Sequence, residues 1–211
     1  MTYKEISGKL FFQFSARLNQ KRPYIVAIDG LSGAGKTTIV KSLEREISNR
    51  NCKAVTIHID DYIVERDKRY NTGFEEWYEY YYLQWNIESL TRHLFEGLLH
   101  NHHDLQLPFY DHSTDSLRMR ALSIPASSIV LIEGIFLQRR EWRGFYDYVI
   151  YLNCPREVRY ERVLKRDSYI GDIQQRLNKY NKRYWPGEKH YLEVENPIEQ
   201  ADVVIDNLNT N

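Results

Sequence analysis

Gly30-Leu-Ser-Gly-Ala-Gly-Lys36-Thr37 is the stretch of this sequence that decides its fold. It matches the pattern G-x-x-x-x-G-K-[S/T], in which glycines allow the backbone to wrap around a phosphate group. Residues 24–29 before it are short and apolar, which predicts a buried strand, and residues 36–50 after it have helical spacing. A helix that begins at such a turn presents positive partial charge to an anion. The stretch therefore predicts a binding site for ATP or GTP.

The loop and the first turn of the following helix supply the predicted nucleotide contacts. The ammonium group of Lys36 can reach the β- and γ-phosphates, and the hydroxyl of Thr37 can bind Mg²⁺. The predicted nucleotide-binding set is Gly30, Ser32, Gly33, Ala34, Gly35, Lys36, Thr37 and Thr38. Kinases, motors, switches and ATPases share this motif, so the reaction has to be inferred from other residues.

Further apolar runs alternate with helical segments along the chain. Besides residues 24–29, strands are predicted at residues 54–59, 128–133, 147–152 and 201–205. Helical spacing covers residues 4–18, 74–99 with a break near Asn86, 156–167 and 172–184, whereas residues 105–115 are predicted to be irregular. This alternation predicts an α/β fold, a doubly wound and mostly parallel sheet with helices on both faces. Because no repeat or linker divides the sequence, residues 1–211 are predicted to form a single domain.

The charge balance bears on the class of partner. Lys and Arg together number 29, as do Asp and Glu, so the formal net charge is zero. Such a balance favours a small-molecule substrate over nucleic acid or an anionic membrane. No run approaches the ~18 apolar residues of a transmembrane helix, and the N-terminus lacks the pattern of a secretory signal. Cys52 and Cys154 are expected to be reduced thiols. The expected location is the cytoplasm.

Acidic residues stand at the ends of two predicted strands. Asp60 and Asp61 follow the second strand, and Glu133 ends the third. Because ligands of such sheets bind beyond the carboxyl ends of the strands, these carboxylates are expected beside the loop. Asp60, in preference to Asp61, is predicted to accept the proton of an attacking hydroxyl; a helix cap or turn residue is the alternative. Glu133 is predicted to help Thr37 hold Mg²⁺.

Arginines share one face of the predicted helix 156–167. Arg159, Arg162 and Arg166 are spaced at i, i+3 and i+7. They could form part of a cationic lid, at about residues 156–185, that closes over the transferring phosphoryl group. The alternative is that they are solvated or paired with acidic neighbours.

An aromatic cluster lies at residues 77–85. Trp77, Tyr81 and Trp85 are spaced four residues apart, as on the core face of a helix. The cluster could instead stack on a nucleobase or form a dimer face, which leaves a homo-oligomer open. His58 falls within the second predicted strand and is expected to be a hydrogen-bonded core histidine.

The ordered set of motifs resembles the uridine kinase and phosphoribulokinase family of P-loop kinases. The motifs are Ile28-Asp-Gly-Leu-Ser-Gly-Ala-Gly-Lys-Thr-Thr38, Asp60-Asp-Tyr62, Pro108-Phe-Tyr-Asp111, Leu131-Ile-Glu-Gly-Ile135, residues 156–162 with 165–167, and residues 201–205. The resemblance implies a P-loop NTPase fold with five parallel strands in the order 2-3-1-4-5. It also implies phosphoryl transfer with ATP and Mg²⁺ as cofactors.

Roles for individual residues follow from the same resemblance. Asp60 would be the catalytic base, Lys36 and Arg162 would act on the phosphates of ATP with Arg166 beside them, and Glu133 would help hold the metal. The implied substrate contacts are Asp60, Tyr62, Tyr110, Asp111 and Arg159.

Two stretches depart from the pattern of that family. Asp115 stands where the family's pocket carries a histidine that contacts the pyrimidine, and Tyr169-Ile-Gly-Asp172 replaces an Arg-Gly-Arg stretch of the lid. The predicted function is an ATP-dependent kinase that acts on a hydroxyl of a nucleoside-like metabolite, as uridine kinase does. A nicotinamide riboside kinase-like or other metabolite kinase, and a nucleotide-binding regulatory protein without kinase activity, are the alternatives.

Overall fold

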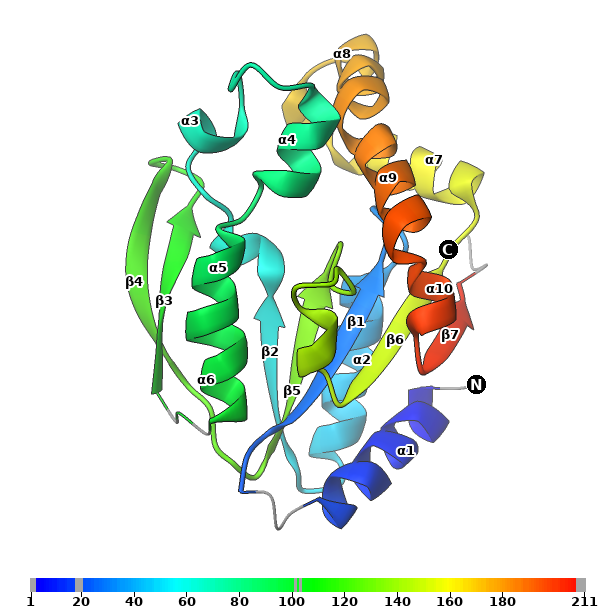
Figure 1. Cartoon of the computed structure of the whole chain (residues 1–211). Helices are drawn as coiled ribbons and strands as arrows, with labels where there is room; N and C mark the ends of the chain where they lie inside the picture. Colours follow the sequence, from blue (N-terminus) through cyan, green and yellow to red (C-terminus); the bar gives the residue numbers. More distant parts are fainter. Residues whose placement is uncertain (1–2, 18–20, 101, 103, 208–211) are drawn as a thin grey trace.

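The computed structural model describes residues 3–17, 21–100, 102 and 104–207 (Figure 1). Its centre is a five-stranded sheet in the order β2-β5-β1-β6-β7, in which every neighbouring pair is parallel. The strands are β1 Tyr24–Gly30, β2 Lys53–His58, β5 Ser128–Gly134, β6 Tyr148–Asn153 and β7 Val203–Asp206. Numbered among themselves, these strands have the order 2-3-1-4-5, which confirms the predicted P-loop NTPase fold.

Helices cover both faces of this sheet and the region beyond the carboxyl ends of its strands (Figure 1). They are α1 Tyr3–Ala16, α2 Lys36–Ser48, α3 Arg66–Arg69, α4 Glu76–Tyr82, α5 Ile87–Leu90, α6 Glu96–Leu99, α7 Arg156–Arg166, α8 Ile173–Lys179, α9 Trp185–Glu195 and α10 Pro197–Gln200. Of these, α3, α4 and α8 lie beyond the carboxyl ends of the strands (Figure 1). Side chains alternate between the faces of a strand. In β1, Val26 and Ile28 therefore belong to the core shared with α1 and α2, whereas Ile25 and Ala27 belong to the core shared with α4, α6 and α9.

The prediction of an irregular stretch at residues 105–115 is wrong. β3, Asp104–Asp111, pairs antiparallel with β4, Ser116–Ser123, in a second sheet that lies beside α5 and α6 (Figure 1). Pro108 argues against a strand because it has no N–H group, but each strand of a two-stranded sheet has a free edge where that loss is tolerated. Leu105, Leu107 and Tyr110 of β3 are buried and anchor the hairpin to the main core.

The predicted helical region at residues 74–99 breaks where it was expected to. α4 ends at Tyr82, and the side chain of Asn86 caps α5 by accepting the N–H of Ser89 at 2.9 Å. Tyr81 and Trp85 are buried in the core, which confirms core packing for these two members of the aromatic cluster.

Three further features concern the N-terminal helix, the cysteines and membrane spans. The N-terminal helix is present as α1, while Leu18 at its predicted end lies outside the described residues. Cys52 and Cys154 are free thiols. In the described part of the chain, no helix has both the length and the apolar character needed to cross a membrane.

Candidate active site

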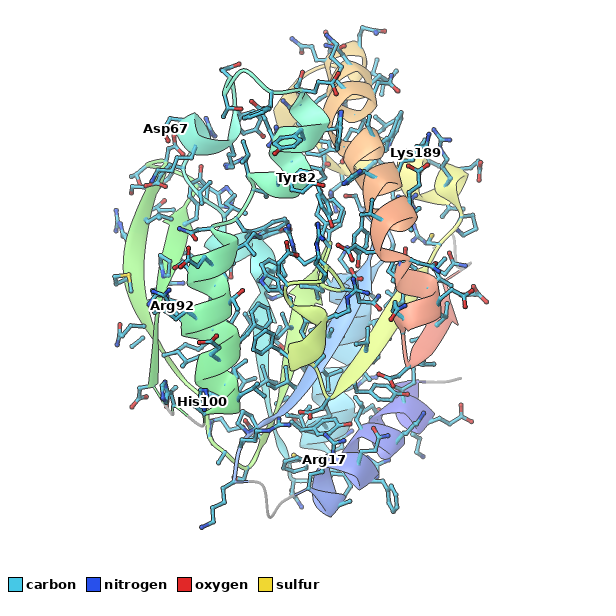
Figure 2. The ribbon with its side chains drawn as sticks, viewed as in Figure 1. Arg17, Asp67, Tyr82, Arg92, His100 and Lys189 are labelled. Atoms are coloured by element: carbon cyan, nitrogen blue, oxygen red, sulfur yellow. The ribbon has the colours of Figure 1, made fainter. Side chains whose placement is uncertain are left out.

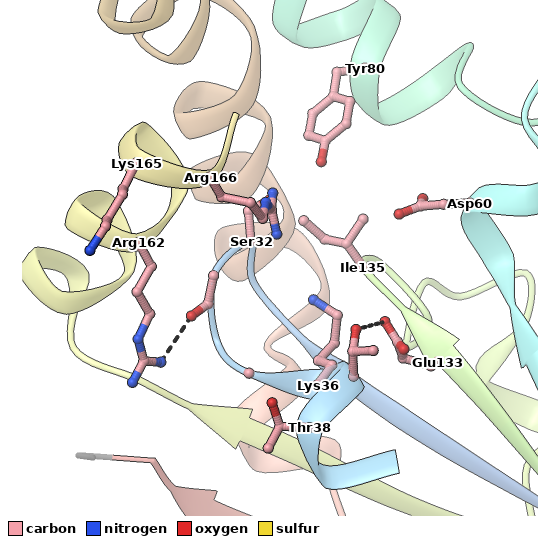
Figure 3. Close-up of a pocket in the computed structure, with 13 residues that line it drawn as sticks. Ser32, Lys36, Thr38, Asp60, Tyr80, Glu133, Ile135, Arg162, Lys165 and Arg166 are labelled. Carbon is pink, nitrogen blue, oxygen red and sulfur yellow. Dashed lines mark hydrogen bonds between the residues drawn. The ribbon is translucent and has the colours of Figure 1, made fainter. Parts of the chain in front are cut away.

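The phosphate loop joins β1 to α2 and borders a cavity of about 630 Å³ (Figure 3). Gly33 and Gly35 have φ angles of 78° and 94°, a conformation that side-chain-bearing residues rarely adopt. Of the predicted nucleotide contacts, those that line the cavity are Ser32, Gly33, Gly35, Lys36, Thr37 and Thr38. Gly30 and Ala34 do not line it. Their carbonyl oxygens accept hydrogen bonds instead, that of Gly30 from Lys36 Nζ and that of Ala34 from Asn207 Nδ2.

Lys36 extends along the loop toward the cavity. Its Nζ donates hydrogen bonds to the carbonyl oxygens of Gly30 and Leu31, at 2.8 Å and 3.2 Å. Burial lowers the pKa of Lys36, and the nearby carboxylates of Glu133 and Asp60 oppose that shift. The ammonium group thus faces two acidic side chains across a gap (Figure 3).

Asp60 lies in the 3₁₀ turn Ile59–Tyr62, which follows β2. The buried side chain of Ile59 anchors the turn, and its carbonyl oxygen accepts a hydrogen bond from Trp85 Nε1 at 2.9 Å. Asp60 borders the phosphate cavity and points into it (Figure 3). Water reaches its carboxylate, yet enclosure by protein raises the pKa of Asp60, and the positive charge of Lys36 only partly offsets this.

The prediction that Asp60 and Asp61 directly follow the second strand needs a small correction. β2 ends at His58, and the two aspartates belong to the next turn, where successive side chains point in different directions. Asp61 lines neither the phosphate cavity nor the cavity that adjoins it. The geometry therefore favours Asp60 over Asp61 as the group that meets a substrate.

Glu133 stands near the end of β5, close to the first turn of α2. Its Oε1 lies 3.4 Å from Thr37 Oγ1, and its Oε2 lies 3.0 Å from His58 Nδ1. Burial acts to raise the pKa of Glu133, but the hydrogen bond from His58 and the charge of Lys36 outweigh it and lower that pKa. Oxygen ligands of this kind suit Mg²⁺, so Thr37 and Glu133 fit the predicted metal site.

His58 was expected in the core, and this is wrong. Its side chain is 45% exposed, because at the last position of β2 it points past the edge of the sheet toward Glu133. The Glu133 hydrogen bond raises the pKa of His58, against the effect of burial. His58 thus supports the carboxylate that fits the metal, a role that the strand pattern does not indicate.

Helix α7 presents Arg162, Lys165 and Arg166 to the phosphate cavity (Figure 3). Arg162 Nη1 donates to the carbonyl oxygen of Gly33 at 3.1 Å, and Arg166 pairs with Asp167 at 2.6 Å. These positions suit contacts with an anion, as predicted for the two arginines. Lys165 was missed by the sequence reasoning, although it directly precedes Arg166.

Arg159 has a different environment from Arg162 and Arg166. It is 7% exposed, and its Nη1 forms an ion pair with Glu188 Oε2 at 2.9 Å. The same nitrogen donates to the carbonyl oxygen of Ser32 at 3.2 Å. Arg159 lines neither the phosphate cavity nor the adjoining one, so the predicted substrate contact of Arg159 does not fit this structure.

Glu188 of α9 binds the backbone of the phosphate loop at Ser32. Its Oε1 accepts the backbone N–H of Ser32 at 2.9 Å, and its other oxygen binds Arg159. The Arg159–Glu188 pair is buried and links α7, α9 and the loop. No sequence motif marks Glu188. Glu188 is three residues before the buried Tyr191, so helical periodicity could have indicated that it faces inward.

We expect Glu188→Gln to weaken ATP binding about tenfold, because a buried charged hydrogen bond contributes about 1.5–3 kcal/mol. The substitution leaves Arg159 without a carboxylate partner and loosens the loop at Ser32. Calorimetric titration with ATP measures the effect. Glu193→Gln is the control, because Glu193 pairs with Lys189 on the exposed side of α9 (Figure 2). Equal ATP affinity in the two variants would contradict a role for Glu188 in holding the loop.

A second cavity of about 720 Å³ adjoins the phosphate cavity. The two cavities share four lining residues: Ser32, Asp60, Tyr80 and Arg166. Asp60 therefore lies at the junction between a space lined by the phosphate loop and a space of the size typical for a small molecule. The rest of its lining includes residues of two segments: Arg66, Asp67, Arg69, Tyr70 and Asn71 from the first, and Lys179, Tyr180 and Tyr184 from the second.

Three predicted substrate residues lie outside both cavities. Tyr110 is buried, and its hydroxyl donates to Asp115 at 2.8 Å. Asp111 accepts hydrogen bonds from Ser113 in the turn of the β3–β4 hairpin. Tyr62 borders a separate hollow beside β3. Of the three, Tyr110 supports the wall of the second cavity, because its hydroxyl accepts a hydrogen bond from Arg69. The predicted direct contacts of Tyr62, Tyr110 and Asp111 do not fit this structure.

This chain is similar to a known family and to several of its members. The model of the phosphoribulokinase/uridine kinase family matches residues 25–211. A solved structure described as a possible uridine kinase from Bacillus stearothermophilus is 43% identical, covers 96% of this chain and 100% of that one, and has a TM-score of 0.75. The uridine kinase of Borrelia duttonii is 28% identical over 191 residues, which cover 86% of this chain and 85% of that one. The uridine kinase of Staphylococcus haemolyticus is 26% identical over 187 residues, with 86% of each chain covered.

Proposed function

Because this chain belongs to the phosphoribulokinase/uridine kinase family, we propose that it transfers the γ-phosphate of ATP to a hydroxyl group of a small, nucleoside-like metabolite. The observation that carries the proposal is the position of Asp60 at the junction of two cavities. In-line transfer requires the attacking hydroxyl oxygen, the γ-phosphorus and the leaving β-phosphate oxygen to lie roughly on one line, with the base within reach of the hydroxyl. Two adjoining spaces with Asp60 at their junction would let ATP occupy one and the acceptor the other, with the hydroxyl beside Asp60.

The phosphate cavity supplies the groups that would hold ATP. The loop amides and the start of α2 face the phosphates, and Lys36 exchanges its carbonyl partners for phosphate oxygens. Thr37 and Glu133 would hold Mg²⁺, which would neutralise phosphate charge during transfer. Arg162 and Arg166 lie on α7 above the same space, where charge develops during transfer.

Asp60 would act on the acceptor. Its carboxylate accepts the proton of the hydroxyl as the new oxygen–phosphorus bond forms and the bond to the β-phosphate oxygen breaks. The raised pKa of Asp60 makes it a stronger base than an ordinary aspartate, and the positive charge of Lys36 opposes its protonation. The expected products are ADP and a phosphate monoester.

The test is ADP release by the purified chain with MgATP and a panel of hydroxyl compounds. The panel contains uridine, cytidine, nicotinamide riboside, sugars, sugar phosphates and hydroxy acids. We expect at least one acceptor to accelerate ADP release more than tenfold over water, because binding of the true acceptor positions its hydroxyl against Asp60. Tight binding of ATP without acceleration by any acceptor would favour a nucleotide-binding regulatory protein instead.

A further inference from the structure

The end of the second cavity that lies away from the phosphate loop is surrounded by cations. The ring of Tyr70 lies 4.9 Å from the Arg69 guanidinium, 4.5 Å from Lys179 Nζ and 4.0 Å from the Arg183 guanidinium, measured to the ring centroid. Arg69, Tyr70 and Lys179 line the cavity, together with the exposed side chain of Arg66. We call Arg66, Arg69, Tyr70 and Lys179 the basic end of the cavity.

Two of the three cations around Tyr70 already have carboxylate partners. Arg183 is fully buried and pairs with Glu79 at 3.0 Å. Lys179 pairs with Glu76 at 2.7 Å, and both of these side chains reach solvent. The charge of Arg183 is therefore balanced in the interior, whereas the Lys179–Glu76 pair reaches solvent, where an ion pair is weak and Lys179 can also bind another anion.

Arg69 differs from them because its partners are neutral. It is 5% exposed, its Nε donates to the carbonyl oxygen of Val64 at 2.7 Å, and its Nη2 donates to the hydroxyl of Tyr110 at 3.2 Å. No carboxylate of the described residues forms an ion pair with Arg69. A buried charge without a counter-ion is costly, and an anion in the cavity would relieve that cost.

One carboxylate outside the cavity partly offsets these charges. Asp115 accepts hydrogen bonds from the Tyr110 hydroxyl and the Arg66 backbone N–H, which lower the pKa of Asp115, and the positive charges of Arg66 and Arg69 contribute to this lowering. Asp115 does not line the cavity, and the carboxylates that do line it lie elsewhere or at its rim. Asp167 pairs with Arg166, and Asp60 stands at the opposite junction. Asp67 lies at the outer rim, where its side chain is exposed on α3 (Figure 2). Burial acts to raise the pKa of Tyr70, yet Arg183, Arg69 and Lys179 together lower it, which reports a positive potential at this position.

On the basis of the proposed function, we infer that the acceptor is anionic. It carries a phosphate ester or a carboxylate that binds at Arg66, Arg69 and Lys179 while its hydroxyl faces Asp60. Arginine and lysine bind both of these oxyanions through charge-assisted hydrogen bonds. An uncharged nucleoside would fill the cavity and leave Arg66 and Arg69 without a counter-ion on the cavity side. The cavity therefore distinguishes a charged acceptor from a neutral one.

Matched pairs of acceptors test the inference with the wild-type chain. Ribose is compared with ribose 5-phosphate, and glycerol with glycerate and glycerol 3-phosphate, while uridine represents neutral nucleosides. We expect the charged member of a pair to have at least about a 100-fold higher kcat/KM, since charged hydrogen bonds contribute most to such discrimination. The glycerate and glycerol 3-phosphate arms show whether the carboxylate or the phosphate is preferred.

Variants at the basic end separate binding from folding. Arg66→Met and Lys179→Met change exposed or partly exposed side chains, and Arg69→Met tests the buried one. We expect each to raise KM for the charged acceptor about 10- to 100-fold, with kcat nearly unchanged and neutral acceptors unaffected. Arg118→Met on β4 is the control, because Arg118 is exposed, pairs with Asp111 and lines neither cavity.

The outcomes separate this inference from the proposed function. Faster turnover of uridine or another neutral acceptor, unaffected by Arg66→Met, would refute an anionic acceptor and leave the kinase function intact.

If no compound is phosphorylated, the kinase proposal fails, and a thermal-shift measurement tests the anion site separately. With a non-hydrolysable ATP analogue bound, ribose 5-phosphate should raise Tm by about 5 °C in the wild type but not in Arg66→Met. The absence of any such rise would overturn the anion site.

Discussion

Asp60→Asn is expected to lower kcat for acceptor phosphorylation about 1,000-fold while ATP affinity stays nearly unchanged, because general-base catalysis contributes about 10²- to 10⁴-fold. Asparagine keeps the size of the side chain but cannot accept the proton of the attacking hydroxyl. Asp60 also makes no contact with the phosphate loop that would be needed for nucleotide binding, since it faces the loop across the cavity (Figure 3). Steady-state kinetics and calorimetric titration with ATP measure the two quantities separately.

The pH profile gives this prediction a second readout. Enclosure in the cavity raises the pKa of Asp60 above the ordinary value for an aspartate. Because the ionised form is the base, activity should fall as pH falls through that raised pKa, so the acid limb of kcat/KM should lie at a higher pH than an ordinary aspartate would give. The residual activity of Asp60→Asn should lack this limb.

Asp61→Asn is the matched control for this experiment. Asp61 is the next residue in the same turn but lines neither cavity, so we expect its variant to keep activity within about threefold of the wild type. Full activity of Asp60→Asn, or an equally large loss in Asp61→Asn, would show that the base has been assigned to the wrong residue.

The parts of the site that the sequence predicts well are contiguous in the chain. The phosphate loop is a local structure, because its glycines, lysine and threonine act within eight successive positions. Asp60 and Glu133 could be placed because parallel strands end at one edge of a sheet, so a residue just after a buried run is located by topology alone. The strand order itself came from the resemblance to a known family.

Other parts depend on contacts between distant segments and leave little trace in the sequence. Glu188 binds the loop at Ser32 across 156 positions of sequence, and a glutamate in a helix is ordinarily solvated. Arg159 shares a helical face with Arg162, but periodicity does not show which member of the face meets a buried glutamate. The basic end of the second cavity unites α3 with α8, and neither helix carries a motif.

The β3–β4 hairpin shows a different limit. Its second strand is largely exposed, so the sequence lacks the apolar run that marks a buried strand, and Pro108 argues against a strand in its partner. The error has a functional consequence. Tyr110 and Asp111 belong to this hairpin, and neither lines the cavity: Tyr110 lies behind its wall against Arg69, and Asp111 accepts hydrogen bonds from Ser113 in the hairpin turn.

Glu79→Ala is expected to destabilise the folded chain by about 3–5 kcal/mol, because it leaves the buried charge of Arg183 without its partner. Both side chains are almost completely buried, at 2% and 0% exposure, and their atoms lie 3.0 Å apart. Glu79 also accepts hydrogen bonds from the backbone and hydroxyl of Thr72. For a chain of this length, such a loss corresponds to a fall in Tm of about 6–20 °C.

An exposed pair provides the control for this effect. Glu88 and Arg92 form an ion pair at 2.8 Å, with their side chains 83% and 65% exposed, and Arg92 lies on the outer surface (Figure 2). Water solvates each charge when the other is removed, so Glu88→Ala should cost less than about 0.5 kcal/mol. Equal losses of stability in the two variants would mean that burial of the Arg183 pair is not what makes it costly to break.

The double variant Glu79→Leu/Arg183→Met tests whether the cost comes from the stranded charge or from lost packing. Replacing both buried charges by apolar side chains removes the uncompensated guanidinium, so stability should recover by several kcal/mol relative to Glu79→Ala, about 2–4 kcal/mol. Arg183 also holds the carbonyl oxygen of Arg69, at 3.0 Å, and so positions the basic end of the second cavity. The double variant should therefore melt close to the wild type, because no buried charge is left unpaired. It should bind an anionic acceptor more weakly, because Arg69 has lost its hydrogen bond to Arg183. Denaturant unfolding measures the role of Arg183 in stability, and acceptor KM on the same preparation measures its role in positioning Arg69. A double variant as unstable as Glu79→Ala would show that lost packing, and not the unpaired charge of Arg183, causes the loss of stability.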